Sequence, residues 1–246
     1  MNDDVPDFLR RLWRLPEAPA RLGRRSTLDV ETVVATAVML ADEGGLGAAT
    51  LPKVAERLGV TPMSLYRYVG SKQELLQLMM DAASAPGGDA EPPADWHDGL
   101  RRWATDLWNL YRARPWLPQV PIYRMPSGPN QMAWLERGLA AMTETGLGAD
   151  RKLMVIGLLS GYVRHSAILA QELDEGQAPV DPSIGDEFVR ALGGLVDAER
   201  YPNVAVLLSG AAMHPDRALD AEAPSDFDAG LGLILDGLAT RIREGA

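Results

Sequence analysis

A length of 246 residues, an apolar share of 46% and a net charge of −10 are compatible with one large or two small globular domains. The chain has no cysteine, which excludes disulfides, thiolate metal sites and cysteine catalysis. It has no uninterrupted apolar run of about 18 residues, and its first residues, MNDDVPDF, are acidic. We therefore expect a cytoplasmic protein without a membrane span or a secretory signal.

The negative charge is unevenly distributed along the chain. Residues 86–246 carry fourteen Lys and Arg against twenty-three Asp and Glu, whereas residues 1–85 carry ten against eleven. Affinity for nucleic acid depends on the charges that face the phosphates rather than on the charge of the whole chain. An acidic C-terminal part is therefore compatible with an N-terminal part that binds DNA.

Residues 1–28 are predicted to form a flexible extension. The apolar residues between positions 8 and 13 can form one helical turn, which the following prolines then end. Arg24 and Arg25 form a small basic cluster, which fits either a solvated charge pair or an arm that contacts DNA.

Residues 29–83 are predicted to form a helical domain that opens with one long amphipathic helix. From Val30 onward, apolar residues recur at spacings of 0, 3, 4, 7, 8 and 11, which indicates one buried helix face. Asp29 is a suitable N-cap for this helix, and the pair Gly44-Gly45 is a suitable stop.

Two short helices follow, over residues 50–59 and 61–70, and Gly59 joins them. Glycine tolerates the positive φ that such a tight turn needs. Thr61 is predicted to cap the second of these helices, and Pro62 fits its first position. This arrangement is a helix-turn-helix, whose second helix is exposed for recognition of DNA.

A fourth helix is predicted over residues 72–83. The sequence Ser71-Lys72-Gln73-Glu74 is a capping box that opens this helix. The free N–H groups and positive dipole end of its first turn favour a phosphate contact.

The exposed side chains of the second short helix suit DNA. Ser64 and Tyr66 can form hydrogen bonds with base edges or phosphates, and Met63 can contact thymine methyl groups. Tyr66 and Tyr68 can alternatively pack on the fourth helix. The predicted DNA contacts are Arg24, Arg25, Thr50, Thr61, Pro62, Met63, Ser64, Tyr66, Arg67, Tyr68 and Lys72.

The segment from Thr50 to Lys72, TLPKVAERLGVTPMSLYRYVGSK, resembles the signature of the TetR (tetracycline repressor) family of regulators. The resemblance covers residues 29–83 and depends on the sequence Leu65-Tyr66-x-Tyr68-Val69 and the lysine that follows it. It implies a homodimer that represses transcription and binds double-stranded operator DNA. Pro52 stands where the tetracycline repressor has a base-reading arginine, so the operator sequence should differ.

Residues 84–246 are predicted to form a larger all-helical domain for ligand binding and dimerisation, so the fold class is all-α. Helices are expected over residues 96–112, 131–145, 151–173, 186–200 and 227–243, and residues 202–225 are not assigned. The helix over 151–173 is apolar nearly all round, which predicts that it is buried. Together with 227–243, it is expected to form a four-helix bundle between two subunits.

An enclosed apolar cavity is predicted beside the helix over 96–112. The segment 115–129 is rich in proline and must pack irregularly against the large side chains of that helix. The candidate walls are Trp103, Leu107, Trp116, Tyr123, Met132, Leu135 and Tyr162. The expected effector is a small apolar or aromatic molecule. Tetracycline is not supported, because apolar residues stand where that repressor has polar ligands.

Enzyme and metal signatures are missing from the sequence. It contains no G-x-S-x-G, P-loop, complete G-x-G-x-x-G or H-E-x-x-H pattern. His97, His165 and His214 have no histidine partner at i,i+4, so neither a metal site nor a cofactor is predicted. Two other hypotheses stay open: a DNA-binding dimer without an effector, and a helical enzyme or small-molecule carrier with a vestigial motif.

Overall fold

The computed structural model describes residues 5–15, 28–87, 93–176, 182–209 and 225–243. These residues form α-helices and short 3-10 turns, with no β-strand among them, which confirms the predicted all-α class. They belong to two compact units, Met1–Ile168 with Leu231–Ala246, and Leu169–Gly230.

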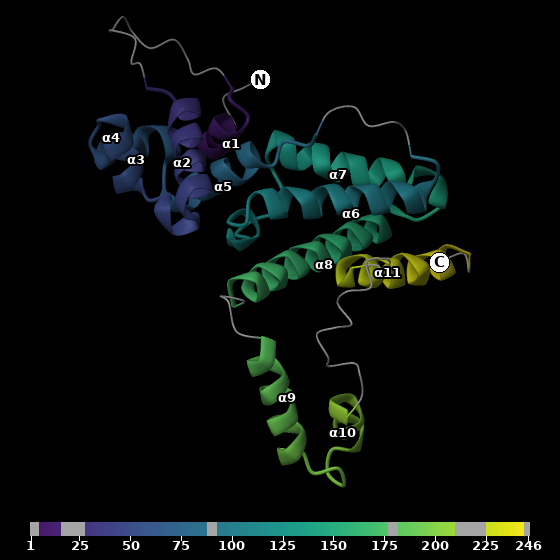
Figure 1. The fold of residues 1–246 in the computed structure, drawn as a ribbon. Coiled ribbons are helices and arrows are strands. Elements are labelled where there is room, and N and C mark those ends of the chain that lie inside the picture. The colour runs from purple at the N-terminus through teal and green to yellow at the C-terminus, as the bar shows by residue number, and fades with distance from the viewer. Residues whose placement is uncertain (1–4, 16–27, 88–92, 177–181, 210–224, 244–246) are drawn as a thin grey trace, which may run out of the picture. The chain divides into compact units, whose positions relative to one another are not determined.

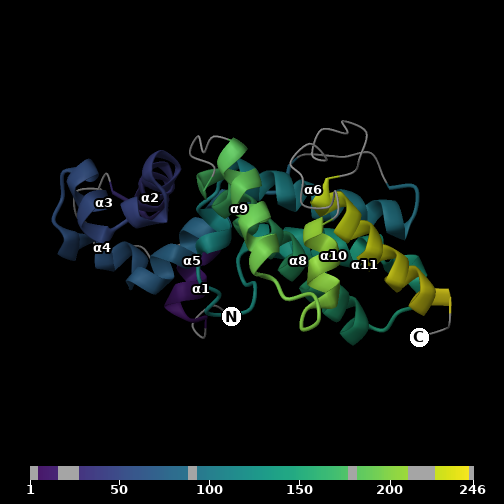
Figure 2. The same cartoon turned by 60° about the horizontal axis from the view of Figure 1, so that its bottom comes forward.

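The first unit begins with a group of five helices (Figure 1). They are α1 (Asp7–Leu12), α2 (Val30–Gly44), α3 (Leu51–Leu58), α4 (Pro62–Val69) and α5 (Lys72–Ala83). Helix α2 contacts α3, α4 and α5, so it forms the centre of this group. Figures 1 and 2 both show α3 and α4 at one end of the unit, with α5 leading towards α6 and α7.

The rest of the first unit comes from longer helices and two 3-10 turns. They are α6 (Trp96–Ala113), the turn Leu117–Gln119, α7 (Pro129–Ala141), the turn Thr143–Thr145, and parts of α8 (Ala149–Gly176) and α11 (Asp226–Arg243). The second unit contains α9 (Pro182–Leu195) and α10 (Pro202–Ser209), which pack against each other. Helix α10 lies in the stretch that the sequence pattern left unassigned.

Three of the predicted helix signals for α2 and α5 are seen in atomic detail: the Asp29 cap, the Gly45 stop and the Ser71 cap. The Asp29 carboxylate accepts a hydrogen bond from the Thr32 N–H at 2.7 Å, and this bond lowers the pKa of Asp29. Gly45 ends α2 with a φ of +74°. The Ser71 hydroxyl accepts from the Glu74 N–H at 3.1 Å, which is one half of the predicted capping box; the other half does not form, because the Glu74 side chain pairs with Arg11. The helix starts are therefore set locally by the residues that the sequence analysis identified.

Helix α1 corrects the prediction of a flexible extension for residues 7–12; residues 1–4 and 16–27 lie outside the described residues. Phe8 and Leu12 are buried in the same apolar core as α2 to α5. The short apolar turn expected near these residues does form, and it is packed rather than loose. Its spacing of four residues places both side chains on one face of the helix.

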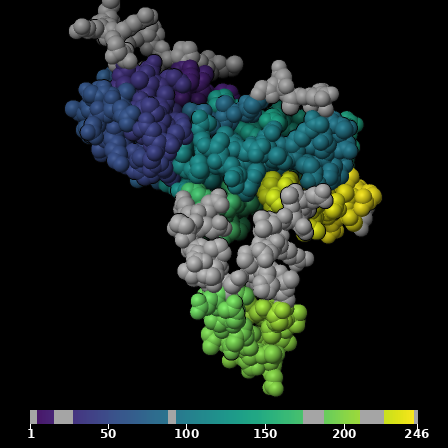
Figure 3. Space-filling model, viewed as in Figure 1, coloured from purple at the N-terminus to yellow at the C-terminus, as the bar shows by residue number. Residues whose placement is uncertain are grey.

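The core of the N-terminal helices also includes residues from beyond the junction. Trp116, Leu117 and Val120 are buried in the cluster that contains Val33, Leu65 and Leu78. Figure 3 shows the purple and blue atoms of the N-terminal helices directly against the teal atoms of α6 and α7. The two predicted domains therefore share one core at their junction.

Asp42 at the end of α2 fixes this junction by polar contacts. Its carboxylate accepts a hydrogen bond from the Trp116 Nε1–H at 2.6 Å and forms an ion pair with the Arg114 guanidinium at 3.2 Å. Arg114 also donates to the carbonyl of Ala83, the last residue of α5, at 3.0 Å. The segment after α6 is thereby attached to both α2 and α5.

Helix α8 differs from its predicted burial. Val155, Leu159 and Val163 are buried, whereas Met154 and Leu158 on the other side of the helix are exposed. A helix of this composition has apolar residues on both faces, and only one face is covered within a single chain. By length and a mean hydropathy of 1.5, residues Ala149–Leu173 could also cross a membrane.

Candidate DNA-binding site

Helix α4 is held in place by a small number of completely buried side chains. Leu65 and Val69 on α4, and Val54 on α3, have no exposed surface. They lie in the core with α2 and α5, which fixes the angle between the two short helices. The opposite face of α4 is therefore presented to solvent with little freedom to rotate.

The turn between α3 and α4 has the geometry that the glycine predicted. Gly59 is in the left-handed region, with φ +67° and ψ +31°. The Val60 N–H donates to the Ala55 carbonyl at 3.0 Å, which ties the turn back onto α3. A residue with a Cβ would be strained at this φ, so the glycine is required by the backbone.

The exposed side chains on and before α4 are those predicted to contact DNA. Met63 is 76% exposed and Tyr66 is 43% exposed, and Thr61, Pro62 and Arg67 are also exposed. Ser64 and Tyr68 are half-buried, and the Arg67 guanidinium lies 5.8 Å from the centre of the Tyr68 ring. The face thus combines an apolar thioether, two phenols and one cation.

Thr61 does not cap α4, which corrects one prediction. Its side chain makes no cap hydrogen bond; instead the Ser64 hydroxyl donates to the Thr61 carbonyl at 2.6 Å. The Ser64 hydroxyl hydrogen is therefore used within the helix. The lone pairs of the Ser64 oxygen remain available to accept a hydrogen bond from a base. An acceptor at this position matches the exocyclic amines of adenine or cytosine.

The other predicted DNA residues have different settings. Lys72 is exposed at the first position of α5, directly after the turn at Gly70. Thr50 caps α3, since its hydroxyl accepts from the Lys53 N–H at 3.5 Å. Arg24 and Arg25 lie outside the described residues.

The connector helix α5 carries a buried carboxylate where it meets α7. Asp81 is almost completely buried, and its Oδ1 accepts a hydrogen bond from the backbone N–H of Gln131 at 3.0 Å. Burial raises the pKa of Asp81, because the charged form loses its hydration. A Cβ at Gly128 would collide with this carboxylate, so the glycine permits the close approach.

Two further hydrogen bonds join α5 to α7. The Asn130 side chain donates to the Asp81 carbonyl at 2.9 Å, and the Trp134 indole donates to the Ser84 carbonyl at 2.7 Å. The end of the connector helix is therefore attached to the first turns of α7 at three points.

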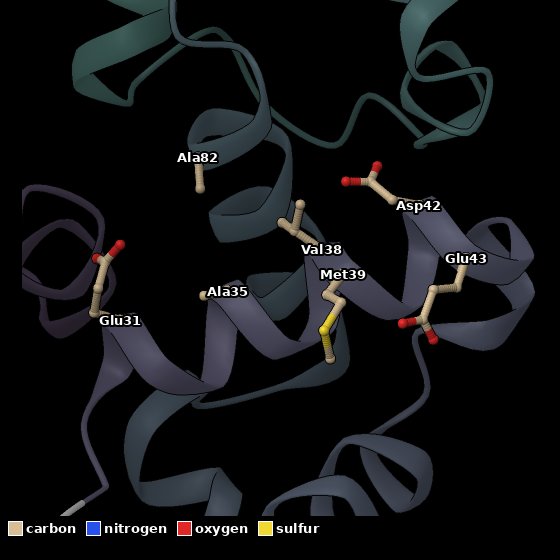
Figure 4. Close-up of a pocket in the computed structure, with 7 residues that line it drawn as sticks. All are labelled: Glu31, Ala35, Val38, Met39, Asp42, Glu43 and Ala82. Carbon is tan, nitrogen blue, oxygen red and sulfur yellow. The ribbon is translucent and has the colours of Figure 1, made fainter.

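A groove of about 480 Å³ lies on the N-terminal helices, beside α2 (Figure 4). Its lining residues are Glu31, Ala35, Val38, Met39, Asp42, Glu43 and Ala82. Each of the three carboxylates has an arginine partner: Arg14, Arg114 and Arg57 respectively. None of the residues predicted to line the effector cavity contributes to this groove.

The residues predicted to line that cavity occupy three different environments. Trp103 and Trp134 are buried, and their rings pack edge to face with 5.9 Å between the ring centres. The Trp103 indole N–H donates to the Trp134 carbonyl at 2.8 Å. Leu107 is buried, and Met132, Leu135 and Tyr162 are half-buried. Trp116 belongs instead to the core of the N-terminal helices, and Tyr123 is 44% exposed.

No group of three or more potential metal ligands occurs among the residues that the structure describes. His97 stacks edge-on against Trp96 at 5.4 Å, and His165 is exposed on α8. His214 lies outside the described residues.

Comparison with known proteins decides the family. Residues 33–79 match the model of "Bacterial regulatory proteins, tetR family", and residues 89–242 match "Tetracyclin repressor-like, C-terminal domain". The chain belongs to the TetR family. It is therefore a helix-turn-helix transcriptional repressor of that family, and α4 lies within the matched residues 33–79.

Relatives of this TetR-family protein match over most of their length. The transcriptional repressor DrrR1 of Streptomyces coeruleorubidus is 34% identical, covering 99% of this chain and 88% of the relative. The class A tetracycline repressor from transposon 1721, from Escherichia coli, is 27% identical over 87% of this chain and 92% of its own. The structure of ActR from Streptomyces coelicolor, in complex with actinorhodin, superposes with a TM-score of 0.71 at 26% identity, covering 88% of this chain and 99% of ActR.

The contacts that join the TetR DNA-binding helices to the rest of the unit were not predicted from the sequence. Asp81, Asp42 and Trp116 are the principal ones. One signal was available: Asp81 interrupts an apolar stretch of α5, and a lone carboxylate there usually has a buried partner. The identity of that partner depends on the tertiary structure.

Proposed function

We propose that the protein represses transcription as a cytoplasmic homodimer bound to a palindromic operator, and that a small apolar or aromatic effector releases it. The observation that carries the proposal is the exposed face of α4, which the buried Leu65 and Val69 hold in a fixed orientation. This face enters the major groove, with Ser64 and Tyr66 towards the bases and Tyr68 and Lys72 towards phosphates.

The dimer is supported by the exposed apolar faces of α8 and α11. Met154 and Leu158 on α8 and Leu233 on α11 are more than half exposed in the single chain. A Cβ at Gly157 or Gly161 would meet no neighbouring atom, and the same is true of Gly232 and Gly237. Glycines on an open apolar face let a second helix approach closely, which fits a four-helix bundle between two copies.

A membrane is a weaker explanation for the same surface. The opposite face of α8 already packs inside the unit through Val155, Leu159 and Val163. A spanning helix would expose apolar residues to lipid on all unpacked sides, whereas α8 has Arg151 and Lys152 in its first turn and Arg164 near its middle. A second copy of the chain would cover the exposed apolar face of α8 without moving these charges into lipid.

The effector is proposed to bind near the buried pair Trp103 and Trp134. Leu107, Met132, Leu135 and Tyr162 supply further apolar or aromatic surface in the same domain. A site of this composition favours a ligand with a large apolar or aromatic surface. The structure of ActR with actinorhodin supports ligand binding by a related protein. We leave Trp116 out of the proposed site, because it lies in the shared core.

The DNA interface makes two separable contributions. Lys72→Ala should weaken binding to operator and unrelated DNA alike, and lower the slope of log affinity against log salt by about one unit per subunit. Ser64→Ala should instead reduce the discrimination between bases, by about 1–3 kcal/mol at one position of each half-site. Fluorescence anisotropy with selected and scrambled duplexes measures both effects. Arg112→Ala, an exposed cation on α6, serves as the control.

Wild-type behaviour of both Lys72→Ala and Ser64→Ala would contradict the recognition-helix assignment. An unchanged base preference in Ser64→Ala alone would contradict only the reading role of that hydroxyl.

Effector release is tested separately. A panel of apolar and aromatic small molecules, with actinorhodin included, is screened by thermal shift and then by release from the operator. An effector should lower operator affinity by about 5- to 150-fold, which corresponds to a coupling of about 1–3 kcal/mol. Compounds that stabilise the protein and leave DNA binding unchanged would support a ligand site and contradict the switch. That result would favour a DNA-binding dimer that has no effector.

A further inference from the structure

The short helix α1 lies outside the residues that match the family's DNA-binding domain, yet it is firmly packed. The match begins at residue 33, whereas α1 spans Asp7–Leu12. Its apolar side is buried through Phe8 and Leu12, and the helix contacts both α4 and α5. It therefore touches the recognition helix and the connector helix at the same time.

On the side of the DNA-binding helices, α1 is attached by one short ion pair. The Arg11 guanidinium and the Glu74 carboxylate are 2.6 Å apart, with 17% and 23% of their side chains exposed. Glu74 is in the first turn of α5, and its side chain turns to Arg11 rather than back to the cap residue. Gly70, with a φ of +67°, ends α4 next to this ion pair. A Cβ at this position would collide with the Glu74 side chain.

On the side of the effector domain, α1 is attached to the segment before α7. The Trp13 indole N–H donates to the Ser127 carbonyl at 2.8 Å. The Arg124 guanidinium lies 5.1 Å from the centre of the Phe8 ring. The Ser127 N–H in turn donates to the Gln131 side chain on α7 at 3.1 Å, so this segment is fixed to the start of α7.

We infer that residues 7–14, here called the N-terminal strap, set the orientation of the recognition helix relative to the effector domain, with Arg11 and Trp13 as positioning residues. Within the first unit the connector α5 is the covalent link between the two domains. The shared core and the Asp42 contacts hold the DNA-binding helices through α2 and the end of α5. The strap adds a separate attachment through α4 and the start of α5. The inference depends on the proposed function. The orientation of α4 matters because the DNA-binding helices of each subunit, here called the head, must bind one half-site of the operator each.

The strap should therefore determine how strictly the protein measures the distance between half-sites. Adding or removing one base pair turns one half-site by about 35° and moves it by about 3.4 Å relative to the other. Heads in a fixed orientation cannot follow this change. DNA-binding helices that keep the shared core but lose the strap are held on one side only, so they can tilt enough to bind both half-sites.

The experiment uses the full-length dimer and an operator selected from random duplexes by the wild-type protein. Affinities are measured for this operator and for versions with one base pair added or removed at its centre. The wild type should lose at least about tenfold in affinity on either change, whereas Arg11→Ala combined with Trp13→Phe should lose less than about threefold. Trp13→Phe keeps the aromatic bulk and removes only the N–H donor, which protects folding.

Arg10→Ala is the matched control, because Arg10 lies on the same helix and donates to the Val5 carbonyl at 3.1 Å, just before α1 begins. This control and Arg11→Lys should both keep the spacing discrimination of the wild type. Loss of stability alone weakens binding to all three operators equally and leaves their ratio unchanged. Retained discrimination in the double variant, or its loss in Arg10→Ala, would overturn the inference.

Failure of the proposed function gives a different result. A wild-type chain that sediments as a monomer, or that selects no operator, would refute both the dimeric repressor and the strap. The strap alone is refuted if the wild type is a dimer that discriminates strictly between operator spacings and the double variant discriminates equally well.

Discussion

Leu158→Glu should convert the dimer into a monomer and abolish operator binding. Leu158 is 56% exposed in the single chain and lies between Gly157 and Gly161, in the centre of the proposed bundle. A two-fold interface contains each substitution twice, so two carboxylates are removed from water without a partner. We expect the dissociation constant of the dimer to rise at least about 1,000-fold, or about 4 kcal/mol.

Operator binding should fail with it, because two unlinked heads no longer gain the effective concentration that the dimer supplies. Sedimentation velocity at micromolar protein, together with operator titration, measures both effects. Ile122→Glu is the matched control, since Ile122 is an apolar residue that is 70% exposed outside α8 and α11. A Leu158→Glu protein that remains dimeric would place the interface elsewhere.

Asp81→Leu should destabilise the protein by about 1–3 kcal/mol, whereas Asp81→Asn should not. Leucine removes the acceptor for the Gln131 N–H and leaves that buried donor without a partner. Asparagine keeps an oxygen acceptor and removes only the charge. Urea unfolding of both variants and of the wild type at neutral pH gives the comparison. Equal stability of the three proteins would contradict the role of Asp81 as the cap of α7.

Comparison of the wild type with Asp81→Asn also predicts how the free energy of unfolding depends on pH. The pKa of Asp81 is raised in the folded protein, so the folded state binds more protons than the unfolded state between the usual carboxyl pKa and the raised one. The free energy of unfolding of the wild type should therefore fall, relative to Asp81→Asn, as pH rises through that window. Comparing the two proteins from the usual carboxyl pKa upward to neutral pH tests this, because the other carboxylates are common to both. A constant or growing wild-type advantage would contradict the burial of a charge.

The helix-turn-helix could be predicted because its determinants are local. The φ of Gly59 and the cap at Ser71 each depend on residues within one helical turn, and the apolar spacing along α4 indicates which face Leu65 occupies. The resemblance to a known family then assigned roles to the exposed residues of α4. The cap at Thr61 was wrong for a local reason too, since the Ser64 N–H donates to the Thr61 backbone carbonyl at 3.0 Å rather than to the Thr61 hydroxyl.

The contacts between the two domains could not be predicted, because their partners are far apart in sequence. Trp116 and Asp42 are separated by 74 residues, and Asp81 and Gln131 by 50. Sequence analysis placed Trp116 beside an effector cavity because large aromatics near prolines suit a pocket wall. The same residue suits a core equally well, and only the packing of α2 against the segment after α6 decides between them.

The exposed face of α8 illustrates a second limit. Apolar residues all round a helix indicate burial, but the pattern does not distinguish burial within a chain from burial between chains. Leu159 and Leu158 are adjacent in sequence and chemically identical, yet the first is buried and the second is exposed. The partner that covers the second face is a property of the assembly.

The shared core at the junction limits how far the DNA-binding head can be treated as a portable module. The family's DNA-binding domain matches residues 33–79. Trp116, Leu117 and Val120 lie outside this match, yet they fill space between its helices. A fragment that stops before residue 114 would expose an apolar surface where these side chains belong, and Asp42 would lose both Trp116 and Arg114 as partners. Grafting this head onto another effector domain would therefore require transplanting the segment 114–120 as well. Recombination between relatives faces the same constraint, so a head and the segment that completes it should be exchanged together.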